Sequence, residues 1–149
     1  MLPLDKSIDL PESYSIQDAV PGVEEYLRLR RVSGLAPRTA PAAEAGLPNS
    51  LFSVCVRQGA HVVGMGRVIG DGALFLHIVD VAVDPHHQGQ GLGKAIVAAL
   101  MRHIARTVPA ETYVSLMANG EAFHLYEQFG FAAVTPEARG MALWVKGPS

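Results

Sequence analysis

The chain has 149 residues, a formal net charge of -2 and 49% hydrophobic residues. This length predicts one domain over residues 1–149, and the apolar content lets burial offset chain entropy without disulfides or a structural metal. Charged residues make up 17% and form no basic run, which excludes the usual electrostatic signature of proteins that bind nucleic acids or membrane surfaces. The single cysteine and the lack of a signal-like or membrane-spanning apolar stretch predict a cytoplasmic protein.

The N-terminal third predicts one strand and one helix, followed by a loop. A short strand is expected at 13–17. Pro21 suits the first turn of a helix, and apolar residues then recur at helical spacing up to Gly34. The segment 34–50 contains three prolines, so we expect a loop with at most one short helix.

The rest of the chain predicts strands that are interrupted by two helices. Apolar runs between Gly, Asp and Pro turns are typical of antiparallel strands, and a period of 3.6 residues is typical of an amphipathic helix. In chain order we expect strands at 51–57, 61–69 and 73–83, a helix from 92 to before Pro109, a strand at 112–117, a helix at 121–129 and closing strands at 131–134 and 141–146. The whole is an α/β chain of about seven strands and about four helices.

The most informative segment is a glycine-rich turn that precedes the long helix. Gly89, Gly91 and Gly93 alternate where the helix begins, so backbone N–H groups and the positive helix end converge on one point. Such a point suits a phosphate-like anion, although a flexible strand-to-helix connection is the alternative. The turn is not a P-loop, because Ala95 rather than a hydroxyl residue follows Lys94, and its third glycine comes one residue early for a dinucleotide-binding turn.

Two motifs together resemble the GNAT superfamily of N-acetyltransferases. The turn Gln88-Gly89-Gln90-Gly91-Leu92-Gly93 resembles that family's Gln/Arg-x-x-Gly-x-Gly/Ala acetyl-CoA loop, which lies between a strand and an amphipathic helix. Residues 119–131 resemble its second motif, with Asn119 after the fifth strand, Tyr126 on the next helix and Phe-Gly-Phe before the sixth strand. The resemblance implies the GNAT fold, a mostly antiparallel mixed sheet splayed between strands 4 and 5, with acetyl-CoA as cosubstrate and no metal.

The resemblance also implies which residues bind the coenzyme. Backbone groups of strand four would bind the pantetheine arm, the glycine turn would bind the pyrophosphate, and two side chains would flank the far end of the arm. The implied cofactor-binding residues are Val81, Ala82, Val83, Gln88, Gly89, Gln90, Gly91, Leu92, Gly93, Lys94, Asn119 and Tyr126.

Three residues are candidates for the transfer step: Tyr126, Asp80 and His77. Tyr126 matches the family's general acid for the coenzyme thiolate, and the alternative is that it only packs in a helical face. Asp80 interrupts an apolar run, where an unpaired carboxylate would be costly; it accepts the amine proton, binds the ammonium or pairs with Arg67. His77 stands where some members carry a glutamate base, and the alternative is a half-buried histidine with a satisfied hydrogen bond.

Strand geometry separates the two candidates for preparing the amine. Strict alternation would place His77 and Asp80 on opposite faces, unless a β-bulge resets the parity. We favour Asp80 as the base, because an unpaired carboxylate is the harder of the two to explain structurally. With Glu24 and Glu25, Asp80 would suit a cationic acceptor if these side chains face the cleft.

The leading interpretation is an N-acetyltransferase that transfers an acetyl group from acetyl-CoA to a primary amine by direct attack. The amine belongs to a small molecule or is an exposed amino group. The alternatives are a non-catalytic acyl-CoA-binding module and an interaction domain that binds no coenzyme. No nucleic-acid or membrane partner is expected, and the resemblance is compatible with a homodimer.

Overall fold

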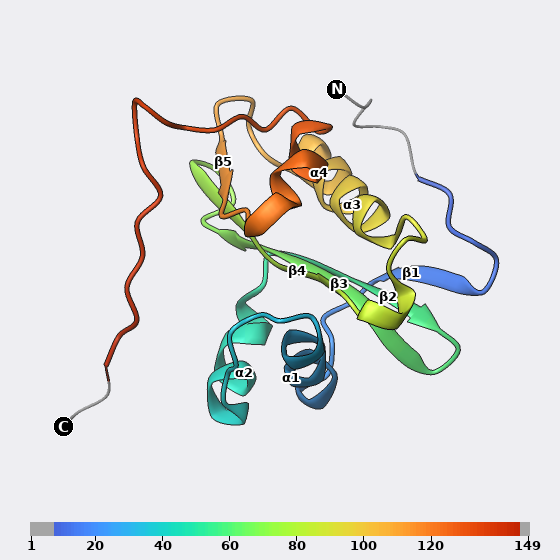
Figure 1. Cartoon of the computed structure of the whole chain (residues 1–149). Helices are drawn as coiled ribbons and strands as arrows, with labels where there is room; N and C mark the ends of the chain where they lie inside the picture. The colour runs from blue at the N-terminus through green and yellow to red at the C-terminus, as the bar shows by residue number, and fades with distance from the viewer. Residues whose placement is uncertain (1–7, 147–149) are drawn as a thin grey trace.

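The computed structural model describes residues 8–146, and a five-stranded sheet with helices on both faces forms its centre (Figure 1). The expected number of α-helices, about four, is confirmed. Across the described chain, no helix combines the length and apolarity needed to cross a bilayer. The elements are β1 (Tyr14–Asp18), α1 (Val23–Val32), α2 (Ala40–Gly46), β2 (Phe52–Gln58), β3 (His61–Gly70), β4 (Phe75–Val83), α3 (Leu92–Thr107), β5 (Tyr113–Leu116) and α4 (Phe123–Glu127), with single 3-10 turns at Leu47–Asn49, Pro85–His87 and Gly120–Ala122.

The sheet runs β1-β2-β3-β4-β5 in chain order. The first four strands are antiparallel neighbours, whereas β5 joins β4 in parallel. This parallel pair is short, because only Phe75–Ile78 of β4 pairs with β5. Within the described residues, the rest of β4 has no strand on that side, so the expected splay between strands 4 and 5 is confirmed in the pairing.

Two apolar layers hold the helices on the sheet. Helices α3 and α4 cover one face, and α1 and α2 cover the other (Figure 1). The 3.6-residue pattern of α3 buries Leu92, Ile96, Leu100 and Ile104 against the sheet, as its sequence predicts. On the other face, Leu29 of α1 packs in a second cluster with residues of β2 and β3.

A β-bulge interrupts the pairing of β3 with β4. The register shifts between Met65 and Arg67, so that Gly66 faces two residues of β4, Asp80 and Val81. Asp80 adopts a φ of 58°, in the left-handed region that Asp and Asn tolerate better than most residues. Gly66 is required here, because a Cβ atom at this position would lie 2.6 Å from Cγ2 of Ile96.

The bulge decides which side chains of β4 share a face. Leu76 and Ile78 belong to the apolar layer under α3, so His77 faces the opposite side. Without the bulge, Asp80 would point the same way as Leu76 and Ile78. Because the extra residue resets the alternation, Val81 packs under α3 and Asp80 joins His77 on the other face.

The closing strands expected at 131–134 and 141–146 are wrong, and with them the count of seven strands. Both segments are irregular, and 131–146 runs past β5 away from α3 and α4 (Figure 1). Met141 is 87% exposed and Val145 is 90% exposed. Their β-type composition suggested strands, but a strand also needs a hydrogen-bonded neighbour, and 131–146 pairs with no other strand of the described chain.

Substituting Gly66 by Ala should destabilise the fold, because the added methyl group meets Ile96 and Leu100. Overpacking of this kind costs about 1–3 kcal/mol of unfolding free energy. The matched control is Gly46→Ala at the end of α2, where a Cβ atom has open space around it. Urea denaturation of both variants measures the difference, and equal stabilities would contradict the tight contact at Gly66.

Candidate functional site

Two cavities meet where β4 and β5 separate. The larger has a volume of about 470 Å³ and lies between the β4–β5 gap and the α1–α2 side of the sheet. The smaller has a volume of about 360 Å³ and extends from the gap to the start of α3. Both are lined by Val81, Ala122 and Tyr126, so together they form one passage through the gap.

The smaller cavity is built from the glycine turn and the free part of β4. Gly89 and Gly91 both have a φ of 80°, which favours glycine, and Gly91 is the N-cap of α3. The first N–H groups of a helix have no partner within it, and the first turn of α3 carries no acidic side chain. The turn therefore presents free donors and a positive helix end to the cavity.

Asp84 anchors the segment that leads into this turn. Its side chain accepts a hydrogen bond from the backbone N–H of His86 at 2.9 Å and from Arg28 at 2.5 Å. Burial raises the pKa of Asp84, but these two donors outweigh it and hold the pKa below its usual value. At the other side, Nε2 of Gln88 donates to the carbonyl oxygen of Val83 at 3.2 Å. These contacts tie the turn to the end of β4.

The structure brings most of the expected coenzyme residues together. Asn119 lines the larger cavity instead, and Gln90 and Lys94 line neither of the two. Among residues 8–146, no three His, Cys, Asp or Glu side chains gather as a metal site. The expected residues that line the smaller cavity are Val81, Ala82, Val83, Gln88, Gly89, Gly91, Leu92, Gly93 and Tyr126.

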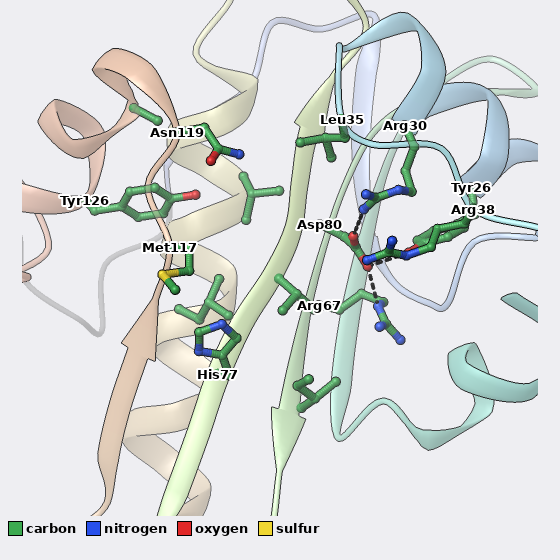
Figure 2. Close-up of a pocket in the computed structure, with 15 residues that line it drawn as sticks. Tyr26, Arg30, Leu35, Arg38, Arg67, His77, Asp80, Met117, Asn119 and Tyr126 are labelled. Atoms are coloured by element: carbon green, nitrogen blue, oxygen red, sulfur yellow. Dashed lines mark hydrogen bonds and ion pairs between the residues drawn. The ribbon is translucent and has the colours of Figure 1, made fainter. Parts of the chain in front are cut away.

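Tyr126 joins the two cavities. Its ring packs in the apolar layer with α3 and lies edge-on to Phe131, with centroids 6.1 Å apart. Its hydroxyl end points from α4 toward β4, across the gap (Figure 2). Burial raises the pKa of this phenol, so it keeps its proton at neutral pH. The residue therefore packs and also presents a protonated donor to the passage.

Asp80 lies at the centre of a buried polar cluster in the larger cavity (Figure 2). Arg30 donates to its Oδ1, while Oδ2 accepts from Tyr26 at 2.9 Å and from Nε of Arg67 at 3.0 Å. The side chains of Asp80 and Arg30 are each 7% exposed. The sequence favoured Asp80 as the base because a buried carboxylate without a partner is hard to explain. In the structure the carboxylate has three partners, so this reason no longer holds. Of the roles considered, pairing with Arg67 is the one visible in the structure.

His77 lines the same cavity, on the same face as Asp80. Its Nδ1 lies 3.0 Å from Oγ of Ser115 on β5. Its Nε2 has no hydrogen-bond partner among the described residues. If Nδ1 carries the proton and donates to Ser115, Nε2 is left as an acceptor without a partner in the described chain.

Sequence reasoning missed the side of the cavity that α1 and the following loop supply. Tyr26 and Arg30 are four residues apart on the face of α1 that packs on the sheet. An arginine on an apolar helical face requires a buried partner, so this spacing was an available signal. Arg38 lies in a proline-rich loop that offers no such pattern, yet it lines the cavity. Glu25 points elsewhere, since it accepts from the N–H of Gly22 at 3.2 Å.

Comparison with known proteins identifies the family. Residues 22–131 match the model of the Acetyltransferase (GNAT) family. The chain belongs to this family. A GCN5-related N-acetyltransferase 2, chloroplastic, from Arabidopsis thaliana is 37% identical over 90 residues, which cover 60% of this chain and 34% of that protein. A mycothiol acetyltransferase from Kocuria rhizophila is 40% identical over 63 residues, or 42% of this chain and 21% of that protein. The GNAT matches thus span about a third or less of these curated relatives' length.

Solved GNAT structures share the fold. A probable acetyltransferase of unknown function from meticillin-resistant Staphylococcus aureus superposes with a TM-score of 0.86 at 40% identity, covering 89% of this chain and 99% of that one. The ribosomal-protein-S18-alanine N-acetyltransferase of Escherichia coli superposes with a TM-score of 0.67 at 20% identity, covering 82% of this chain and 79% of that one. The second likeness concerns the fold alone.

Replacing Asp80 by Asn should lower the free energy of unfolding by about 3 kcal/mol, because Arg30 and Arg67 would stay buried without a counter-charge. The control is Glu24→Gln on the exposed side of α1. Denaturant unfolding measures both variants. An Asp80→Asn variant of wild-type stability would contradict the structural role of the cluster.

Proposed function

We propose that this GNAT protein transfers the acetyl group of acetyl-CoA to a primary amine, and that the two cavities hold the two substrates. The observation that carries this proposal is the position of Tyr126, whose protonated hydroxyl lies where a cavity with phosphate-binding features meets a polar cavity. A binding module for the coenzyme alone would need only the first of these.

The residues of the smaller cavity suit the coenzyme. The glycine turn and the N-terminus of α3 offer N–H donors for a pyrophosphate, since neither Gly89 nor Gly91 places a side chain there. On the β5 side, Val81–Val83 pair with no strand of the described chain, so apart from the Val83 carbonyl held by Gln88 their backbone offers hydrogen-bonding groups to the amides of a pantetheine arm. Bound here, acetyl-CoA would supply the thioester that an amine attacks with loss of the thiolate.

Tyr126 and His77 have complementary roles in this proposal. When the C–N bond forms and the C–S bond breaks, the leaving sulfur needs a proton and the attacking nitrogen must lose one. Tyr126 holds its proton at the phenol oxygen beside Val81 and gives it to the sulfur. His77 takes the amine proton at Nε2, directly or through one water molecule, while Ser115 orients its ring.

Asp80 acts as a positioning residue rather than as the base. Its two oxygens already accept from three donors, two of them arginines, so the carboxylate is engaged in holding this cluster together. Its contacts fix Arg30 and Arg67 on the wall of the larger cavity, which holds the acceptor amine in this proposal and is called the acceptor cavity below. The names of two relatives mention different compounds, mycothiol for the Kocuria rhizophila protein and spermine for a probable spermine N(1)-acetyltransferase of Bacillus subtilis. Because these names differ, the class of amine has to be inferred from the residues that line the larger cavity.

Replacing Gly91 by Glu should abolish acetyl-CoA binding, because the carboxylate would occupy and repel the pyrophosphate position. Gly72→Glu is a matched control: the two glycines have φ values of 80° and 81°, and a Cβ atom has open space at both. Gly72 lies in the β3–β4 turn, away from the start of α3. Calorimetric titration with acetyl-CoA should show binding to the control only. Unchanged affinity in Gly91→Glu would contradict the assigned coenzyme cavity.

Replacing Tyr126 by Phe should lower kcat by about 10²–10⁴-fold with little change in coenzyme affinity, because the ring stays and the proton donor is lost. Burial raises the pKa of Tyr126 above its ordinary value, so in the wild type any loss of kcat through ionisation of this donor should begin at a higher pH than for a free tyrosine. Steady-state kinetics with a thiol-detecting reagent checks both statements. Full turnover in Tyr126→Phe would reduce Tyr126 to a packing residue.

A further inference from the structure

The acceptor cavity carries an excess of positive charge. Its lining includes three guanidinium groups, from Arg30, Arg38 and Arg67, and a single carboxylate, from Asp80. Without counting His77, these four groups leave a formal excess of two positive charges. The carboxylate side chains that a cationic acceptor would require are missing, because neither Glu24 nor Glu25 lines the cavity.

Of the three arginines that line the cavity, Arg38 is the one that makes no ion pair with Asp80. Arg30 and Arg67 both contact Asp80, whereas Arg38 has no carboxylate partner among residues 8–146. It stacks on Trp144, with its central carbon 4.5 Å from the ring centroid, and is exposed. It lies on the α1 side of the cavity, across from Tyr126 and Asn119 (Figure 2). A guanidinium placed in this way is available to a ligand.

We propose that the acceptor amine carries an anionic group, a carboxylate or a phosphate, and that Arg38 binds it. The inference rests on the proposed function and names its substrate class. Arginine matches both anions with two parallel N–H donors, and its stacking on Trp144 limits the orientations of the fork. With the anion at Arg38, the amine end of the same molecule extends toward the gap, where Val81 and Tyr126 lie.

The same charges assist the reacting nitrogen. A neutral amine is the nucleophile, and nearby positive charges disfavour its protonated form. An amine that enters beside Arg30 and Arg67 therefore loses its proton more readily than it does in water. Polyamines, which carry several positive charges and no anion, are disfavoured by the same field.

The test compares amines that differ only in the anion. The pairs are tyramine with tyrosine and ethanolamine with phosphoethanolamine, and spermidine represents the polyamines. We expect kcat/KM to be at least about tenfold higher for tyrosine than for tyramine, or for phosphoethanolamine than for ethanolamine. A preference in the first pair identifies a carboxylate as the anion, and a preference in the second identifies a phosphate. The two amines of a pair also differ in the pKa of their amino groups. The result is therefore decided by how the ratio of their kcat/KM values changes when Arg38 is substituted.

Arg38→Gln should raise KM for the preferred anionic amine about tenfold or more and leave KM for the partner that lacks the anion within about twofold. Arg38→Lys should keep part of the preference, since it retains the charge but not the fork. The matched control is Arg31→Gln, because Arg31 is exposed on α1 and does not line the cavity. It should behave as the wild type.

Two results would overturn the inference, and they can be told apart. Acetylation that favours tyramine, ethanolamine or spermidine, with a ratio that Arg38→Gln leaves unchanged, would refute the anionic acceptor and leave the acetyltransferase proposal standing. Binding of acetyl-CoA without thioester turnover of these amines or of a broad panel of other amines would refute both proposals.

Discussion

The contact on which the site depends is the Asp80 carboxylate held between two arginines. Arg67 reaches it from β3 and Arg30 from α1, and Tyr26 supplies a third donor. Through polar contacts, this cluster joins α1 to β3 and β4, in a region where the other contacts between α1 and the sheet are apolar. Each charge is buried and depends on the others, because an arginine without the carboxylate would bear its full desolvation cost. The wall of the acceptor cavity is thus also a structural joint.

The bulge in β4 makes that contact possible. It turns Asp80 toward α1, and it comes just after Ile78, where the pairing with β5 ends. Bulges bend a strand and increase its twist. The extra residue therefore turns the Asp80 carboxylate toward α1, and it lies where β4 stops pairing with β5. The gap exposes the backbone of Val81–Val83 on one side and admits the Tyr126 hydroxyl on the other. Both cavities therefore derive from the same irregularity.

Local patterns predicted the parts of this fold that local forces determine. The amphipathic period of α3, the turns between β2, β3 and β4, and the glycine turn were all readable, because each depends on residues close in sequence. The segment 141–146 shows the limit: its apolar composition suits a strand, but a strand forms only beside a hydrogen-bonded neighbour, and local sequence does not specify one. Likewise, the sequence could mark Asp80 as costly to bury but could not show Arg30, which lies fifty residues away, as its partner. Arg38 had no pattern at all, since a loop brings it to the cavity.

The distribution of charge explains how one passage could serve two substrates. The start of α3 is positive through its free N–H groups, and the acceptor cavity is positive through its arginines, so both ends attract anions. The junction between them is lined by Val81, Ala122 and Tyr126, none of which is charged at neutral pH. A nitrogen at this junction meets no carboxylate that would hold it as an ammonium ion, because Asp80 is engaged by its arginines. In the proposed reaction, the amine proton would leave to Nε2 of His77 or to water, while the anionic groups bound at either end would hold both substrates in place.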